Sequence, residues 1–335
     1  MELDLPVLLG LAVVFAVIMY VVMDGFDLGV GVLFLPAPSD ADRDVMMNSI
    51  APFWDGNETW LVLGGTLLIA AFPVAYATLL PAFYIPIVTM LLALIFRGIA
   101  FEFRFRAGRF RRLWDLAFSG GSALAGFCQG IVLGAFIDGI RVEGDAFAGG
   151  TFDFVSPFSI LCGFGVVAGY ALLGATWLIL RTDGTTSRYG RAATGPALWM
   201  TLAFIAAVSV WTPITHAEIA QRWFSWPNIA WLSPVPILTA VTAIGIWRSI
   251  EGPHEARPLL LSIALFLLAF FGLSISLWPY AVPYSATLWQ AASSPPTLVF
   301  VGVGTAVIVP IVLAYMSFAH WVFRGKLGAE TGYGG

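Results

Sequence analysis

Charged side chains are scarce in this sequence. Only 11% of its 335 residues are Asp, Glu, Lys or Arg, whereas a soluble domain usually carries about 25%. Hydrophobic residues make up 59% of the chain, and the mean hydropathy is +0.88. The composition therefore excludes the soluble fold classes and indicates a protein that crosses a membrane several times.

Residues that hold metals and cofactors are also few. Cys128 and Cys162, the two cysteines, lie in separate apolar runs and form no metal-binding spacing, so zinc and iron–sulfur sites have no support. The three histidines, His216, His254 and His320, fall at different positions in the predicted topology, which argues against a haem held by two histidines of this chain. Nucleotide-binding and hydrolase motifs are lacking as well. The sequence thus indicates one subunit of a larger complex.

Long apolar runs dominate what is present. A membrane-crossing helix needs about 20 mostly apolar residues, and nine runs qualify. We therefore expect an all-α polytopic membrane protein that forms a single integral membrane domain over residues 1–335. In the second span, Asn48 is expected to cap the helix and Pro52 to lie in its first turn. The predicted spans are approximately 7–34, 50–72, 75–100, 114–138, 157–181, 196–215, 232–249, 258–279 and 297–322.

Basic residues indicate the orientation. With the N-terminus outside, 14 of the 16 Lys and Arg residues fall on the inner side, as expected for a membrane protein whose inner loops are positive. An odd number of spans is needed to keep Arg324 and Lys326 inside, so the C-terminus is predicted to lie inside. We interpret the Arg-rich stretch from Arg104 to Arg112 as an anchor beside anionic lipid. It is too short to favour nucleic-acid binding.

Four carboxylates lie inside the predicted spans. Asp24 and Asp27 belong to the sequence DGFDLG of the first span, and Asp55 and Glu58 belong to WDGNETW at the start of the second. A carboxylate at the bilayer centre costs about 2.5–3.5 kcal/mol even on lenient insertion scales, so these groups must face protein or water. The spacing of three residues places each pair on one face of its helix.

Two interpretations of these acids are open from the sequence. In the first, they cap helices and form ion pairs at the inner interface, as the helix dipole favours for Asp55. In the second, they line a hydrated route for protons, because desolvation raises the pKa of a carboxyl group towards neutrality. Arg97 and Glu102 end the third span on the same side, and Arg97 is a natural counter-charge. We favour the proton route for Asp55 and Glu58 and a structural role for Asp24, and leave Asp27 between the two.

The residues around these acids resemble subunit II of the cytochrome bd family of quinol oxidases, which includes cyanide-insensitive terminal oxidases. The resemblance is dense over about the first 120 residues and sparse afterwards. It rests on residues 24–29, on 48–52 leading into 54–60, on Phe96-Arg97-Gly98 with Glu102, and on Trp114-Asp115.

This resemblance implies an electrogenic complex that oxidises quinol and reduces dioxygen to water during aerobic respiration in the bacterial cytoplasmic membrane. Two haems b and one haem d are then held by subunit I, and this chain supplies no metal ligand. The implied fold is two four-helix bundles, at about 7–138 and 157–279, plus a peripheral ninth helix at about 297–322. The resemblance also allows a structural quinone in this subunit and small single-helix partners.

By the same resemblance, Asp55 matches a carboxylate on a proton route between the subunits. Asp27, Trp54, Arg97 and Glu102 match its surroundings. Glu58 and Asp24 complete the predicted pathway. The sequence leaves two other hypotheses open: a secondary transporter that couples protons to a substrate, and a scaffold in which the acids serve assembly only.

Overall fold

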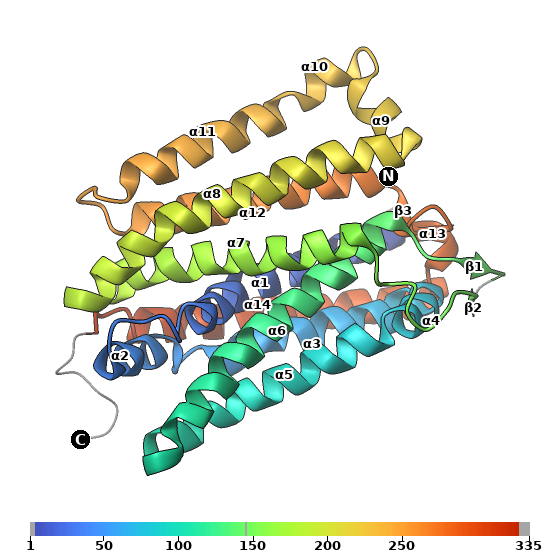
Figure 1. Cartoon of the computed structure of the whole chain (residues 1–335). Helices are drawn as coiled ribbons and strands as arrows, with labels where there is room; N and C mark the ends of the chain where they lie inside the picture. The colour runs from blue at the N-terminus through green and yellow to red at the C-terminus, as the bar shows by residue number, and fades with distance from the viewer. Residues whose placement is uncertain (1–3, 145, 328–335) are drawn as a thin grey trace.

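The computed structural model describes residues 4–144 and 146–327, and most of these residues are helical. The long helices run side by side between two ends of the molecule, and short elements cover those ends (Figure 1). The elements up to residue 147 are α1 (Leu5–Val32), α2 (Asp40–Ile50), α3 (Trp54–Ala71), α4 (Pro73–Ala82), α5 (Tyr84–Phe103), η1 (Arg104–Arg106), η2 (Gly108–Phe110), α6 (Arg111–Asp138), β1 (Val142–Glu143) and β2 (Ala146–Phe147). The later elements are α7 (Pro157–Arg181), α8 (Gly184–Thr215), α9 (Ala217–Phe224), α10 (Asn228–Leu232), α11 (Pro234–Ser249), α12 (Ala256–Leu277), β3 (Tyr280–Val282), β4 (Ala286–Thr287), α13 (Leu288–Ala291) and α14 (Pro295–Val322).

The predicted all-α membrane fold is confirmed. In the described part of the chain, 8 helices are long and apolar enough to cross a membrane, and they account for every predicted span except the second. The second span corresponds to α3, which is less apolar because its first two turns contain Asp55, Asn57 and Glu58. The total of nine spans therefore stays a prediction.

Two predicted boundaries are wrong. Asn48 does not cap the second span, because it lies inside α2, and α3 begins only at Trp54. Pro52 lacks the N–H that would continue the hydrogen bonds of α2, so the chain turns there. The third span begins at Tyr84 rather than at residue 75, because 73–82 form the separate helix α4. Pro86 is tolerated near the start of α5, where its missing N–H leaves no gap in the helix.

The long helices form two halves and one peripheral helix. The first half is α1, α3, α5 and α6, the second half is α7, α8, α11 and α12, and α14 lies against α1 and α3 (Figure 1). The halves meet where α1 and α6 pack against α7, and α1 approaches α7 closely. A Cβ atom on Gly29 would lie 1.8 Å from the carbonyl oxygen of Tyr170, and one on Gly174 would lie 2.2 Å from the carbonyl carbon of Gly29. Only glycine fits both positions, and this close approach brings α7 against the polar part of α1.

The two ends of the molecule differ in charge. We call the end that carries η1, η2 and α2 the basic end. Lys326 also lies there, with its Nζ atom 2.8 Å from Oδ1 of Asp183 at the start of α8. Asp4, at the opposite end, accepts a hydrogen bond from the indole of Trp289. The start of α1 and the end of α14 therefore lie at opposite ends (Figure 1), as an odd number of crossings requires.

Candidate functional site

Three helices of the first half bring buried charges together near the basic end. Arg97 on α5 and the two aspartates of α1, Asp24 and Asp27, have 0% exposure. Nη1 of Arg97 lies 3.3 Å from Oδ1 of Asp24, and Nη2 lies 3.9 Å from Oδ2 of Asp27. The predicted role of Arg97 as a counter-charge is therefore confirmed, and the guanidinium pairs with both aspartates rather than one.

Helix α3 completes this group with one acid and one amide. Glu58 lies 3.1 Å from Nη1 of Arg97, and its side chain is 28% exposed. Asn57 is fully buried and donates through Nδ2 to Oδ2 of Asp27, at 2.7 Å, and to the carbonyl oxygen of Met23, at 3.1 Å. We call Asp24, Asp27, Asn57, Glu58 and Arg97 the Arg97 cluster. The sequence motif contained Asn57, but its role in joining α3 to α1 was missed.

Aromatic rings cover one side of the guanidinium. Trp54 stacks on Phe101 with 4.9 Å between the ring centres, and the Arg97 guanidinium carbon lies 6.0 Å from each ring. A Cβ atom on Gly98 would lie 3.2 Å from the indole of Trp54, so the glycine after Arg97 leaves room for that ring. Trp54 thus adjoins the cluster, as predicted, and shields its charges.

Two predicted site residues lie outside the cluster. Asp55 is exposed, and its Oδ1 atom accepts a hydrogen bond from the backbone N–H of Gly56 at 2.7 Å. Glu102 is exposed near the end of α5. The depth of each acid in the membrane could be estimated from its position in the sequence. The rotation of a helix about its axis, however, decides which side chains meet. Asp55 and Glu58 therefore occupy neighbouring positions on α3 with different exposure.

Several buried polar atoms of the cluster lack a hydrogen-bond partner within the described part of the chain. Among the described residues, these are Oδ2 of Asp24, Oδ1 of Asp27, Oδ1 of Asn57, and Nε and Nη2 of Arg97. Buried polar atoms are almost always hydrogen-bonded to protein or to ordered water. The cluster therefore has unused hydrogen-bonding capacity of both kinds, donor and acceptor.

A chain of polar side chains leads from the cluster into the joint between the halves. Tyr20 lies on α1 one helical turn before Asp24. Gln129 of α6 donates through Nε2 to the hydroxyl of Tyr20 at 2.8 Å, and Tyr170 of α7 donates its hydroxyl to Oε1 of Gln129. These residues were not predicted from the sequence. A signal was available in Gln129, because an amide in the middle of an apolar helix needs a partner on another helix.

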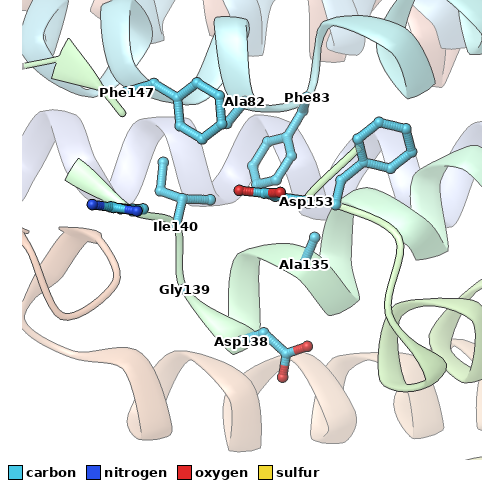
Figure 2. Close-up of a pocket in the computed structure, with 10 residues that line it drawn as sticks. Ala82, Phe83, Ala135, Asp138, Gly139, Ile140, Phe147 and Asp153 are labelled. Carbon is cyan, nitrogen blue, oxygen red and sulfur yellow. The ribbon is translucent and has the colours of Figure 1, made fainter. Parts of the chain in front are cut away.

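A small cavity lies at the opposite end of the molecule. Its volume is about 120 Å³, and its lining includes Asp138, Asp153 and Phe83. Figure 2 shows Asp153 beside Phe83, and Asp138 directed away from both. Asp138 accepts a hydrogen bond from Ser156 at 3.0 Å, and its Oδ1 atom lies 3.7 Å from Nε2 of His216. This hollow contains none of the predicted site residues.

The comparisons with known proteins agree with the resemblance. A family model described as cytochrome bd terminal oxidase subunit II matches residues 5–323. The chain belongs to this family. Cytochrome bd-I ubiquinol oxidase subunit 2 of Escherichia coli (strain K12) is 30% identical over 93% of this chain and 92% of the relative. Cytochrome bd ubiquinol oxidase subunit 2 of Bacillus subtilis (strain 168) is 27% identical over 91% of each chain.

A solved structure supports the fold of this subunit II family member. The structure of bd oxidase from Geobacillus thermodenitrificans matches with a TM-score of 0.77 and 16% sequence identity, and covers 96% of this chain and 99% of that chain. The chain is therefore a multi-pass membrane protein with the fold of a bd oxidase subunit. His216 and His320 stack on Tyr284 and Phe53 at opposite ends, an arrangement that does not fit two axial ligands of one haem.

Proposed function

We propose that this chain is subunit II of a cytochrome bd-type quinol oxidase, and that its acids take up protons for the reduction of dioxygen to water in a haem-bearing subunit I. The observation that carries the proposal is the Arg97 cluster. Asp24, Asp27 and Glu58 share one guanidinium, and Glu58 alone among the three is partly exposed. Asp24 and Asp27 are thus fully buried, and Glu58 is the acid of the cluster that solvent can reach.

Charge balance supports a proton in this cluster. With all three carboxylates ionised, one Arg97 would leave two net negative charges (three minus one) in a buried place. Neighbouring carboxylates in such a site do not all ionise, because each charge opposes the next and burial opposes all of them. The cluster therefore holds at least one proton, and Glu58 is the member through which this proton exchanges.

The proposed route enters at the basic end, which we place at the cytoplasmic face. Asp55 is exposed one helical turn before Glu58 and is the first acid on α3. From Glu58 the proton reaches Asp24 or Asp27 through water bound to the partnerless polar atoms of the cluster. Trp54 excludes bulk water from the Arg97 side. Glu102 is exposed at the same end and belongs to the entrance rather than to the cluster.

The exposed face of α3 indicates where subunit I binds. Asp55, Thr59, Val62 and Thr66 are exposed and form one stripe along the helix. A Cβ atom on Gly65, in the same region, would meet nothing within 4 Å. Polar and small residues at this spacing suit a neighbouring helix, whereas lipid would leave the Asp55 carboxylate unsolvated. We propose that subunit I covers this stripe and receives protons beside it.

Family membership supports the remaining features of the proposed complex. Haems in subunit I supply the electron-transfer and oxygen chemistry, and quinol and dioxygen are substrates of the complex. We place the complex in the bacterial cytoplasmic membrane, with bundles at about 7–138 and 157–279 and a ninth helix at about 297–322. The proton route requires neither a quinone nor a single-helix partner on this chain.

The test uses the intact complex with Asp55→Asn. We expect normal haem content in the visible spectrum and a fall in quinol-driven oxygen consumption of at least about tenfold, since proton transfer by a positioned group contributes about 10²–10⁴ in rate. Asp153→Asn at the opposite end is the matched control and should keep full activity. Full activity in Asp55→Asn would favour a scaffold. Substrate-dependent proton uptake by the chain alone would favour a transporter.

A further inference from the structure

The arginines of the turn between α5 and α6 divide into two sets. In the first set, Arg104 has 0% exposure and pairs with Asp44 of α2 and Asp115 of α6. Arg111, the other member, pairs with the same Asp44. These ion pairs join the turn to α2 and to the first turns of α6. Both guanidinium groups therefore hold the turn in place and have their counter-charges within the chain.

The second set is exposed. Arg106, Arg109 and Arg112 are exposed to solvent, and no ion pair joins them to the described part of the chain. Gly108 lies between them with a φ of +48°, a conformation that glycine adopts without strain, and the chain turns there between η1 and η2. Three guanidinium groups thus lie within seven residues of one turn and lack counter-charges.

Few acids oppose these charges. Residues 102–115 contain Glu102, which is exposed, and Asp115, which is buried against Arg104. The exposed part of the turn therefore carries three positive charges and one negative charge, a net charge of +2 (three minus one). A guanidinium group binds a phosphate through two parallel hydrogen bonds. The turn accordingly offers donors of the geometry that phosphate accepts.

Exposed apolar side chains adjoin these arginines. They are Phe103, Phe105, Phe110 and Leu113, with exposed fractions between 45% and 61%. The Arg109 guanidinium carbon lies 4.8 Å from the centre of the Phe110 ring, and Phe103 stacks on Trp114 at 5.3 Å. The described part of the chain leaves these side chains largely uncovered, so the turn combines bare rings with unpaired positive charge.

The order of side chains along the two helices indicates a membrane surface as the partner. Exposed apolar residues continue from the turn back into the spans, for example Phe96 and Ile99 on α5 and Leu116 on α6. The exposed arginines follow where these helices end, at the lower edge of Figure 1. A bilayer has the same order, because its apolar core ends at a layer of phosphate headgroups, and aromatic side chains are enriched at that boundary.

We propose that the exposed face of the α5–α6 turn is a docking surface for anionic phospholipid in the leaflet at the basic end. Arg106, Arg109 and Arg112 bind the headgroup phosphates. The rings of Phe105 and Phe110 lie at the level where the acyl chains begin. The inference goes beyond the proposed proton uptake, and neither depends on the other.

The experiment uses the intact complex in phosphatidylcholine nanodiscs that contain a small fraction of phosphatidylglycerol with a photoreactive acyl chain. Cross-links to residues 103–116 are measured by mass spectrometry. We expect the yield to fall about fivefold for each arginine replaced by glutamine, and about 10²-fold in the triple variant Arg106→Gln, Arg109→Gln and Arg112→Gln. A photoreactive phosphatidylcholine, which has no net charge, should cross-link equally in all variants.

The matched control removes the same charge from the same end. It is the triple variant Arg188→Gln, Arg248→Gln and Arg257→Gln, which replaces exposed arginines of the second half. Its cross-links at the α5–α6 turn should equal those of the unmodified protein. Raising the salt concentration from about 0.1 M to about 1 M should lower the phosphatidylglycerol yield in both, because salt screens exposed charges. Inorganic phosphate should displace no more probe than chloride at equal ionic strength.

Three outcomes overturn the inference. If the Arg106, Arg109 and Arg112 variant keeps the phosphatidylglycerol cross-links of the unmodified protein, these arginines bind no headgroup. If inorganic phosphate displaces the probe more than chloride does, the surface takes free phosphate rather than lipid. If this variant loses haem-containing complex while the cross-links per assembled complex stay unchanged, the surface belongs to a protein partner. Should too little of the triple variant assemble for measurement, Arg109→Gln alone decides by its expected fivefold loss.

Discussion

The buried polar residues of α1, α3 and α5 in the first half differ from those of α8 and α12 in the second half. In the first half, Asp24, Asp27, Asn57 and Arg97 are fully buried and bond from one helix to another. In α8 and α12 of the second half, the buried polar residues include serines and threonines whose hydroxyls return to a carbonyl oxygen one turn back on the same helix. Examples are Thr194 to Gly190 at 2.8 Å, Thr201 to Ala197 at 2.7 Å and Ser262 to Pro258 at 2.9 Å.

This difference separates what the fold needs from what the proposed function needs. Hydroxyls that bond their own helix can lie in a membrane interior at little cost, because no charge is buried and no second helix must supply a partner. Buried carboxylates and a guanidinium are expensive and depend on one another. Since α8 and α12 pack without them, the Arg97 cluster is not a general requirement of the helical fold.

The largest expected effect comes from removing the shared cation. Arg97→Leu leaves Asp24 and Asp27 buried without a counter-charge, which costs about 3–5 kcal/mol for a broken buried pair. We expect little assembled complex, measured as haem-containing protein on native gels. Thr201→Ala in α8 is the second-half control and should assemble normally, since its hydroxyl bonds only Ala197 of the same helix. Equal assembly of both variants would show that the two interiors tolerate change alike.

A smaller effect is expected at the joint between the halves. Gly29→Ala places a methyl group against the backbone of Tyr170, and overpacking of this kind costs about 1–3 kcal/mol or more. The thermal midpoint in detergent should fall. Gly302→Ala in α14 meets nothing within 4 Å and should match the unmodified protein. A joint that accepts both substitutions equally would contradict the described crossing.

The smallest effect is expected for Asp42, an acid of α2 at the basic end. Burial opposes the charge of Asp42, but hydrogen bonds from Ser39, Thr185 and Thr186 outweigh it and hold the pKa of Asp42 below its usual value. This lowered pKa stabilises the contact of α2 with α8 above the unfolded value of about 3.9, and the stabilisation is lost as the pH falls through the folded-state pKa. We expect less than about 1 kcal/mol.

The measurement for Asp42 is the thermal midpoint between pH of about 6 and about 3. The unmodified protein should lose slightly more stability than Asp42→Asn over this range. Because Asp42 is outside the Arg97 cluster, oxygen consumption near neutral pH should stay the same. A strong loss of activity in Asp42→Asn would show that an acid outside the interior of the first half also contributes to the function.

Much of the architecture could be predicted from the sequence, because apolar length alone marks a membrane helix. The span at 157–181 coincides with α7, and the pairing of Arg97 with the acids followed from charge in an apolar context. Helix rotation could not be predicted. The sequence placed Asp55 and Glu58 on one face, yet only Glu58 reaches Arg97.

The polar chain was missed for a related reason. Tyr20, Gln129 and Tyr170 lie on helices far apart in the sequence, and they meet because Gly29 and Gly174 let α1 and α7 approach. The glycine spacing along α1 indicates that another helix approaches closely, but it does not identify that helix or the side chains that the approach brings together. The breaks at Pro52 and before Tyr84 were missed because apolar composition continues through them while the backbone does not.

The most direct test of the central claim is proton uptake by the intact complex in proteoliposomes during quinol oxidation, compared between Glu58→Gln and Glu143→Gln. Glu143 is exposed at the opposite end, where it pairs with Arg141. The account predicts that uptake at the basic end slows at least about tenfold in Glu58→Gln and is unchanged in Glu143→Gln, with normal haem content in both. Uptake at the full rate in Glu58→Gln would contradict it.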